Sequence, residues 1–578
     1  MAAGIVRIGG ASGFWGDSSV AAPQLAAVPG IRYLAFDYLA ELTMSILAGA
    51  RARNPDLGYA TDFVEIVARQ VLKVCKARGI RLIANAGGVN PAACARALEK
   101  LAAELGVALR IGVVDGDDVL RLVPPRAERV ISANAYLGAL PVARALDLGA
   151  DVVVTGRVVD SAVTLGALIH EFGWRADDYE RLAAGSLAGH LIECGCQATG
   201  GLFTDWQDVP GWANMGYPVL ECAADGSFVV TKPGGTGGLV SVPALAEQML
   251  YEIGDPANYV LPDVVCDFTA VRMEQAGRDR VRVSGARGRP PTGEYKVSAT
   301  YADGFRAVGT LTITGFDASA KARRSGEAIL ERTRAIFEKL GLGDYIATDL
   351  SVLGTEGAYG PHAQAHDLRE AVMRLAVSHR RKEALEIFAR EIAPAGTSWS
   401  AGTSGSLNAG RPNVSPQIKQ FSFLLPKSQV RPRVSFEGKT EDVEIPPGSP
   451  ELLVAGKDLE SKNPEMPPDA VTVPLIKLAY ARSGDKGDSS NVGIVARKPE
   501  YLPWIAGQVT ATAVADYLRH LVKGRVTRYA LPGVGALNFV LEEALGGGGM
   551  ASLRSDPLGK GMAQIVLSMP VRVPRDLA

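Results

Sequence analysis

The sequence predicts an α/β protein with a large N-terminal region, an α+β extension of that region and a small C-terminal domain. Over the first 175 residues, short apolar runs alternate with helical patterns, which is typical of consecutive βα units in an open, mostly parallel sheet. Residues 471–578 read as strand, glycine-rich loop, strand, helix, strand, short helix and strand, an order close to a ferredoxin-like α+β sandwich. Between these regions, residues 266–315 alternate apolar and polar side chains, as antiparallel strands do.

Five apolar runs of the N-terminal region are predicted strands, and glycines or short polar residues follow each of them. The runs are 5–8, 33–36, 81–84, 109–114 and 151–154. Helical patterns lie between them, most clearly at 62–77 and 91–105. Because ligands bind beyond the carboxyl ends of the strands in such sheets, we expect a ligand site where these loops meet.

The chain divides into four predicted segments. These are an α/β ligand-binding domain at 1–260, an α+β domain at 261–440, a proline-rich linker at 441–470 and a ferredoxin-like domain at 471–578. In the second domain we expect helices at 321–339 and 367–391. In the last domain we expect helices at 502–522 and 536–545.

The composition argues against several classes of protein. The 578 residues are 47% hydrophobic and carry a net charge of −1, so there is no basic surplus for a nucleic-acid partner. No apolar run approaches the ~18 residues of a membrane span, and the first residues do not read as a signal peptide. Six cysteines in so long a chain do not form a disulfide framework. We therefore expect a cytoplasmic protein without a membrane partner, and domains of this size favour a homo-oligomer.

The glycine-rich loop after the first predicted strand is the first candidate for ligand contact. Glycine lets backbone amides approach a ligand closely, and the candidates here are Gly10, Ser12, Gly13 and Trp15. The spacing is not the G-x-G-x-x-G fingerprint of dinucleotide binding, although Asp37 ends the second strand where a ribose-binding acid stands. Asp17 within the loop would repel a pyrophosphate. A purely structural turn explains the same glycines.

Two further loops of the N-terminal region supply candidates at strand ends. The loop after the third strand offers Asn85, Gly87 and Gly88 as ligand-binding residues. After the fifth strand comes Arg157, whose guanidinium can hold a carboxylate or phosphate in a bidentate fork. Asp160 and Ser161 follow Arg157, and capping of the next helix explains them as well as chemistry does.

Residues 185–201 hold the densest set of reactive side chains. His190 can transfer protons near neutral pH, and a partly buried Glu193 with a raised pKa can do the same. The alternative for both is packing and capping on a helix face. Cys194 and Cys196 form one C-x-C, which is a weak metal signal without a second pair. With six histidines in the whole chain, we predict no metal site.

Two lysine-containing loops complete the candidate site. In residues 232–238, Lys232 and Thr236 flank glycines in an order that is not a Walker loop. A hairpin turn explains this loop equally well. In residues 481–491, Asp485 and Lys486 belong to a loop too long and charged for an ordinary hairpin. We expect it to close over a ligand held by the first domain, with a solvated surface loop as the alternative.

Seven segments spread over nearly the whole chain carry a family resemblance. They are GGASGFWGDS (9–18), FDYLAELTM (36–44), ANAGGVNP (84–91), TGRVVDSA (155–162), GHLIECGCQATGG (189–201), KPGGTGG (232–238) and ARSGDKGDSSNVGI (481–494). Together they resemble the acyclic terpene utilisation protein A family. The resemblance implies a large α/β region followed by a small ferredoxin-like domain, and a setting in the bacterial catabolism of acyclic terpenoids through branched acyl-CoA thioesters. It implies no roles for individual residues.

The leading functional hypothesis is an enzyme that hydrates, dehydrates or cleaves a branched acyl-CoA or a related carboxylated intermediate. Arg157 and Lys232 would neutralise the ligand, His190 or Glu193 would move the proton, and Asp37 is a further catalytic acid/base candidate. No cofactor is predicted, with CoA expected only as part of the substrate. The alternatives are a non-catalytic ligand-binding or assembly subunit and a nucleotide-dependent oxidoreductase.

Overall fold

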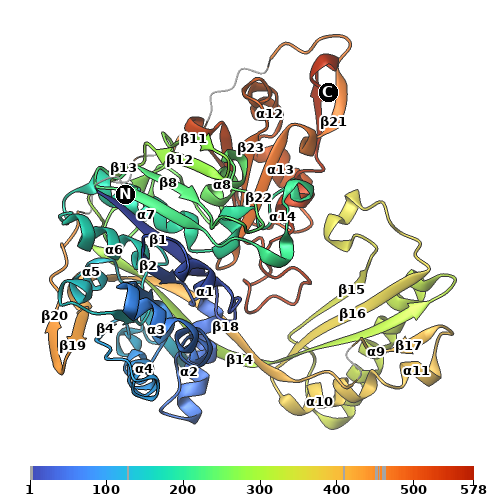
Figure 1. The fold of residues 1–578 in the computed structure, drawn as a ribbon. Helices are drawn as coiled ribbons and strands as arrows, with labels where there is room; N and C mark the ends of the chain where they lie inside the picture. The colour runs from blue at the N-terminus through green and yellow to red at the C-terminus, as the bar shows by residue number, and fades with distance from the viewer. Residues whose placement is uncertain (1–3, 127–128, 408–409, 450–453, 455, 459–463) are drawn as a thin grey trace.

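An eleven-stranded sheet forms the centre of the molecule (Figure 1). The computed structural model describes residues 4–126, 129–407, 410–449, 454, 456–458 and 464–578. Five neighbouring strands of the sheet run parallel, in the order β1 (Ile5–Ser12), β2 (Ile31–Phe36), β3 (Arg81–Ala84), β6 (Val152–Thr155) and β4 (Ile111–Asp115). The predicted open α/β sheet is confirmed, with a parallel centre inside a sheet that is mixed as a whole.

Antiparallel strands extend this sheet on both sides. Beyond β1 lie β7 (Val219–Ala223), β8 (Phe228–Thr231), β12 (Arg280–Ser284) and β11 (Arg272–Gly277). Beyond β4 lie β19 (Arg433–Phe436) and β20 (Lys439–Asp442). A separate three-stranded sheet is built from β13 (Arg287–Arg289), β10 (Val265–Asp267) and β9 (Tyr259–Val260).

Helices cover both faces of the large sheet because side chains alternate along its strands. Leu34 and Leu82 pack into one core, which is covered by α1 (Ala21–Ala26), α3 (Arg69–Arg78) and α4 (Pro91–Leu105). Tyr33 and Ile83 pack into the opposite core, which is covered by α5 (Leu140–Asp147), α6 (Ala162–Phe172), α7 (Tyr179–Ile192) and α8 (Val242–Leu250). The helix α2 (Glu41–Arg53) adds Met44 and Leu47 to the first core and also contacts β5 (Val130–Ala135) and β14 (Glu294–Thr314).

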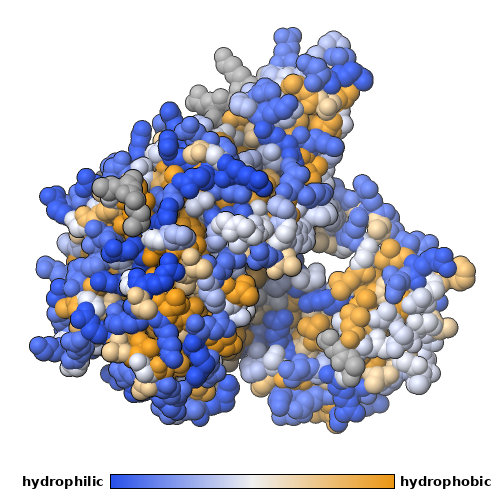
Figure 2. All heavy atoms as spheres, in the orientation of Figure 1, coloured by the Kyte–Doolittle hydropathy of each residue, from blue (hydrophilic) through white to orange (hydrophobic). Residues whose placement is uncertain are grey.

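A 21-residue strand, β14 (Glu294–Thr314), joins the main body to a separate lobe. Its first half pairs with β5 (Val130–Ala135) and β18 (Ser415–Pro426), and its second half pairs with β16 (Glu370–His379) and β17 (Thr403–Gly405). The lobe also holds β15 (Ala347–Leu353), α9 (Ala318–Leu340), α10 (Lys382–Glu391) and α11 (Ala395–Ser398). In the space-filling view the lobe is separated from the main body by a hollow (Figure 2).

The helix predicted at 367–391 is wrong in its first half, where the chain forms β16. Ala371, Met373 and Leu375 are buried at alternate positions, so the segment follows the two-residue period of a strand. Only α10, from Lys382 onward, keeps the helical period.

The C-terminal domain is ferredoxin-like, as predicted. Its antiparallel sheet has the order β22 (Ala479–Lys486), β23 (Ser489–Ala496), β25 (Ala536–Leu541) and β24 (Val526–Leu531). The strands β21 (Val471–Pro474) and β26 (Pro570–Val573) form a separate pair. The helices are α12 (Leu502–Gln508), α13 (Ala511–Tyr517) and α14 (Met562–Val566).

Two helices predicted in this domain differ from the structure. The segment 536–545 begins with strand β25, because Leu537, Phe539 and Leu541 alternate into the core. The long helix predicted at 502–522 is two short ones, since Thr510 interrupts it and caps α13 by accepting a hydrogen bond from the backbone of Ala513 at 3.1 Å.

The segment predicted as a linker lies partly outside the described residues. Its described parts follow the surface of the other domains: β20 ends at Asp442, and the Ala530 amide donates to the Lys457 carbonyl at 3.0 Å. In the part of the chain that the structure describes, no helix combines the length and apolarity needed to cross a membrane.

Candidate active site

The carboxyl ends of the parallel strands bring together four residues that the sequence analysis named. Ser12, Asp37, Asn85 and Arg157 follow or end β1, β2, β3 and β6, and all four are buried. Asn85 Nδ2 donates to Asp37 Oδ1 at 2.5 Å, and Ser12 Oγ donates to the Asp37 carbonyl at 2.9 Å. Burial raises the pKa of Asp37 well above its usual range, and the Asp160 and Glu193 carboxylates add to this shift. Burial of Asp37 therefore favours its protonated form.

Arg157 is 3% exposed and forms an ion pair beside Asp37. Its Nη1 donates to Asp160 Oδ1 at 2.7 Å and to the Leu39 carbonyl at 3.0 Å, while its guanidinium lies 4.1 Å from the centre of the Tyr136 ring. The buried Nε has no hydrogen-bond partner among the described residues. The N-cap of the following helix is Ser161, whose side chain makes no capping hydrogen bond. Asp160 thus serves as the counter-ion of Arg157.

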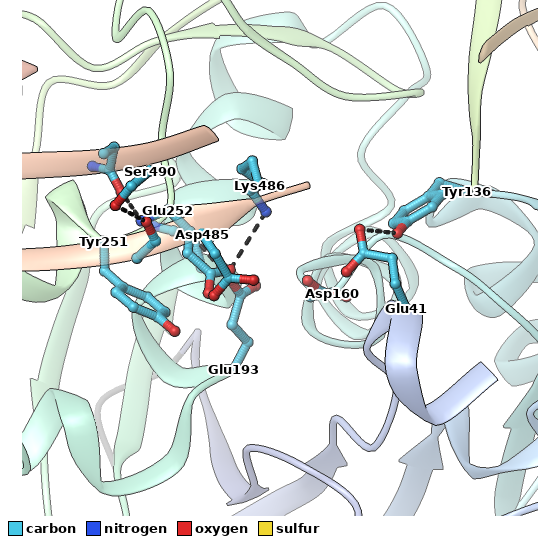
Figure 3. Close-up of polar contacts among 12 residues, drawn as sticks. Glu41, Tyr136, Asp160, Glu193, Tyr251, Glu252, Asp485, Lys486 and Ser490 are labelled. Atoms are coloured by element: carbon cyan, nitrogen blue, oxygen red, sulfur yellow. Dashed lines mark hydrogen bonds and ion pairs between the residues drawn. The ribbon is translucent and has the colours of Figure 1, made fainter. Parts of the chain in front are cut away.

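His190 and Glu193 form a buried pair at the end of α7. His190 Nδ1 lies 3.0 Å from Glu193 Oε1, and His190 Nε2 lies 3.1 Å from the Met249 carbonyl. Burial lowers the pKa of His190, but the Glu193 carboxylate outweighs burial, so the pKa of His190 is raised overall. Burial raises the pKa of Glu193. His190 is 1% exposed and has both ring nitrogens occupied, so Glu193 is the member of the pair that faces the site (Figure 3).

One side of the site, which we call the hairpin wall, consists of Glu252 from the turn after α8 and of Asp485, Lys486 and Lys560 from the C-terminal domain. Lys486 Nζ lies 3.5 Å from Glu252 Oε2, and Lys560 Nζ lies 3.3 Å from Glu252 Oε1 and 3.1 Å from Asp485 Oδ1. Lys560 also donates to the Tyr251 hydroxyl. The prediction that 481–491 is a loop too long for an ordinary hairpin is wrong, because β22 and β23 pair as far as Lys486 and Ser489 and two residues join them. Asp485 and Lys486, predicted to close over the first domain, lie at the end of β22 beside the Leu250–Gly254 turn.

The backbone of Glu252 is strained and held by the C-terminal domain. Its φ is 60°, in the left-handed region that non-glycine residues rarely adopt. Asn491 fixes this turn, because its Oδ1 accepts from the Glu252 amide at 2.9 Å and its Nδ2 donates to the Leu250 carbonyl at 2.6 Å. The clamp directs the Glu252 carboxylate toward Lys486 and Lys560.

The opposite side of the site, which we call the helix wall, consists of Glu41, Tyr136, Asp160 and Lys296. The Tyr136 hydroxyl donates to Glu41 Oε1 at 3.0 Å, and Lys296 Nζ lies 3.7 Å from the same oxygen. Burial alone would raise the pKa of Glu41, but Lys296, Arg157 and Lys486 lower it to about 2. Figure 3 shows Glu41, Tyr136 and Asp160 across a shared space from Glu193, Glu252 and Lys486.

Sequence reasoning missed Glu41, Tyr136, Glu252, Lys296 and Lys560. Glu41 lies within the motif at 36–44, so its position beside a strand end was an available signal. Lys296 lies on β14, away from any glycine-rich loop, and Lys560 stands between Gly559 and Gly561 just before α14. Only the folded chain brings these two lysines to the carboxyl ends of the parallel strands.

The glycines of the candidate loops mainly permit close packing of the backbone. A Cβ on Gly10 would lie 2.6 Å from the Ile192 carbonyl oxygen, and one on Gly13 would lie 2.7 Å from the Cys194 carbonyl carbon. A Cβ on Gly87 would lie 2.5 Å from the Thr155 carbonyl oxygen, and Gly88 has a φ of 55°. These contacts bring the end of α7, with Glu193, against the end of β1.

The first glycine loop does not present its amides to a nucleotide. The Gly10 amide donates to the Pro218 carbonyl at 3.0 Å, and the Gly13 amide donates to Asp17 Oδ2 at 2.9 Å. Trp15 packs, partly buried, against the core beneath α1, α3 and α4. This geometry does not fit a dinucleotide-binding loop, whose amides must be open to the pyrophosphate.

Lys232 and Thr236 lie outside the shared space of the two walls. Lys232 Nζ donates to the Thr236 carbonyl at 3.0 Å and lies 3.4 Å from Asp279 Oδ2. Both residues line a surface pocket of about 410 Å³, together with Arg7, Glu221 and Arg280. The structure therefore separates them from Arg157, with which the sequence analysis had grouped Lys232.

The two cysteines of the C-x-C segment are protonated thiols. Burial raises the pKa of Cys194 well above its usual range and that of Cys196 to about 12. Among the described residues, no three His, Cys, Asp or Glu side chains are grouped so that they could hold a metal ion.

Comparison with protein families gives two matches that together cover most of the chain. Residues 6–436 match the acyclic terpene utilisation family protein AtuA, and residues 473–572 match the AtuA ferredoxin-like domain. Searches of curated proteins and of solved structures gave no match. The second match coincides with the domain that carries Asp485, Lys486 and Lys560. The chain belongs to the acyclic terpene utilisation family.

Proposed function

We propose that the protein is an acid–base enzyme that hydrates, dehydrates or cleaves a branched acyl-CoA or a related carboxylated intermediate of acyclic terpene catabolism. The observation that carries the proposal is the convergence of Asp37, Glu193 and Arg157 on one space between the two walls. Family membership supports the catabolic setting.

In this proposal Asp37 and Glu193 act as the acid and the base. In dehydration, the Glu193 carboxylate removes a proton from the carbon beside the thioester carbonyl, and Asp37 gives its proton to the departing hydroxyl group. A C–H bond and a C–O bond break, a C=C bond forms, and water leaves; hydration is the reverse. The raised pKa of Asp37 suits a proton donor, and the Glu193–His190 pair supplies the base when its proton resides on His190.

Arg157 and His190 support these two carboxyl groups. The Arg157 guanidinium lies near both Asp37 and Asp160 and stabilises negative charge that develops between the walls. His190 acts through Glu193 as a positioning residue and proton reservoir, since both its ring nitrogens are already bonded.

The packing of the C-terminal domain supports an enzyme over an assembly subunit with a free docking module. Arg482 of β22 forms an ion pair with Glu247 of α8 at 3.0 Å, and both side chains are almost fully buried. The end of α8 is also bonded to Asn491 of β23. This face of the C-terminal domain is therefore packed against α8, beside the proposed site.

The proposal is tested by proton exchange and turnover with branched 3-hydroxyacyl-CoA and 2-enoyl-CoA thioesters in D2O. We expect deuterium at the carbon beside the carbonyl and interconversion of the two thioesters by the wild type. Glu193→Gln should lower the rate about 10²- to 10⁴-fold, as expected for loss of a general base. Glu221→Gln, a partly buried carboxylate outside the site, is the matched control. Exchange at the wild-type rate in Glu193→Gln would exclude this role.

A further inference from the structure

Lys296 and Lys486 are the most loosely paired cations of the site. Lys296 Nζ lies 3.7 Å from Glu41, and Lys486 Nζ lies 3.5 Å from Glu252. Both distances exceed those of well-formed N–H···O bonds, about 2.7–3.2 Å. Their side chains are 40% and 46% exposed, more than those of their partners. Each ammonium group therefore has room for another acceptor.

These two ammonium groups come from distant parts of the chain and act on the same place. Lys296 lies on β14 and Lys486 at the end of β22, on opposite walls. Both lower the pKa of Glu41, and Figure 3 shows Lys486 and Glu41 on opposite sides of one shared space. Lys296 is also held over the Tyr136 ring, with its Nζ 5.0 Å from the ring centre.

The approach of like charges indicates that an anion belongs between the walls. Burial lowers the pKa of Lys296, and the nearby charges of Lys486 and Arg157 lower it further, although Glu41 opposes this shift. Arg157 adds a buried Nε without a hydrogen-bond partner in the part of the chain that the structure describes. An anionic group between these cations would relieve their repulsion and supply acceptors.

We propose that Lys296 and Lys486 together bind a carboxylate of the substrate and thereby bridge the helix wall and the hairpin wall. The inference rests on the proposed function for the class of ligand. Apart from the proposed acid–base residues Asp37 and Glu193, four cations border the space and four carboxylates balance them: Arg157, Lys296, Lys486 and Lys560 against Glu41, Asp160, Glu252 and Asp485. A carboxylate adds one negative charge to this balanced set and a phosphate dianion adds two, so the two loosely paired lysines suit the carboxylate better.

The experiment is calorimetric titration of the full chain with a branched-chain carboxylic acid, its methyl ester, and CoA without an acyl group. We expect the acid to bind, and its affinity to fall about ten- to hundredfold in Lys296→Met and in Lys486→Met, the range for loss of a charged hydrogen bond. The methyl ester, which carries no charge, should bind the wild type about ten- to hundredfold more weakly than the acid does. Lys419→Met is the control, because Lys419 is 33% exposed and pairs with Asp303 in the lobe's connecting strands. Circular dichroism and thermal melting confirm that each variant is folded.

Several outcomes would overturn the carboxylate bridge. They are wild-type affinity for the acid in both variants, equal affinity for acid and ester, or an acid that does not bind at all. Tight binding of CoA that depends on both lysines would assign the site to phosphate instead. If the acid binds and needs both lysines but no turnover is observed, the carboxylate bridge is supported and the acid–base proposal is excluded. Turnover of a carboxylated substrate with unchanged KM in Lys296→Met keeps the acid–base proposal and removes the bridge.

Discussion

Two arginine–carboxylate pairs in the protein show how differently the same chemistry can be used. Arg482 pairs with Glu247 at 3.0 Å, and the two side chains are 3% and 0% exposed. Its other donors bond to Gln197, Gln248 and the Gly201 carbonyl, so the guanidinium is fully satisfied. Arg157 pairs with Asp160 at 2.7 Å, but Asp160 is 24% exposed and no described residue accepts a hydrogen bond from Arg157 Nε. The saturated pair joins two domains, and the unsaturated pair borders the space where we place a ligand.

The largest expected effect comes from breaking the saturated pair. Glu247→Ala leaves the Arg482 cation buried without its counter-ion, which costs about 3–5 kcal/mol. Because this pair lies between α8 and β22, we expect the C-terminal domain to loosen before the main body unfolds. Urea unfolding followed by circular dichroism measures the cost, and limited proteolysis reports which domain opens. Wild-type stability in Glu247→Ala would contradict a structural role for the pair.

A smaller effect on stability is expected from the titration of Asp117, a buried acid that accepts a hydrogen bond from the backbone of Arg157. The Arg157 amide donates to Asp117 Oδ2 at 2.9 Å, and burial raises the pKa of Asp117 to about 7. The folded state therefore holds a proton between pH 4 and 7 that the unfolded state releases, so stability falls as pH rises through this window. With 1.36 kcal/mol per pKa unit, the loss is at most about 4 kcal/mol.

The check is the pH dependence of urea unfolding for the wild type and Asp117→Asn. The variant has no proton to release at this position, so its stability should change less between pH 4 and 7 than that of the wild type. Parallel curves for the two proteins would show that Asp117 is not the group responsible.

The smallest effect is expected at an exposed pair of the C-terminal domain. Arg525 Nη2 lies 2.9 Å from Glu542 Oε1, with side chains 75% and 43% exposed. Glu542→Gln should change the free energy of unfolding by no more than about 1 kcal/mol, because water screens the charges. Chemical denaturation of this variant beside Glu247→Ala sets the scale of the comparison. A loss equal to that of Glu247→Ala would mean that burial does not separate the two pairs.

The sequence could predict the parallel sheet because each of its strands is a continuous apolar run that ends in polar or glycine residues. The same pattern made it possible to predict Asp37, Asn85 and Arg157 as site residues, because the carboxyl ends of parallel strands meet at one edge of the sheet. The glycines were harder to interpret. Gly10 and Gly13 are required by the approach of Ile192 and Cys194, a long-range contact that no local pattern reveals.

Lys296, Lys560 and Glu252 could not be predicted because their positions depend on how separate regions pack. Lys296 reaches the site through the pairing of β14 with β5, and Glu252 through the clamp of Asn491. The helix predicted at 367–391 was wrong for a local reason. Its apolar residues suit a helix or a strand equally, and pairing with β14 makes the first half a strand.

Because β14 is one long strand, it connects the site directly to the lobe. A strand of 21 residues spans roughly 70 Å when extended, and Lys296 stands near its start while the lobe is built on its end. Inserting or deleting one residue between them would turn every following side chain of the strand to the opposite face. The spacing from Lys296 to the lobe is therefore a property of the chain that point substitutions preserve and length changes destroy.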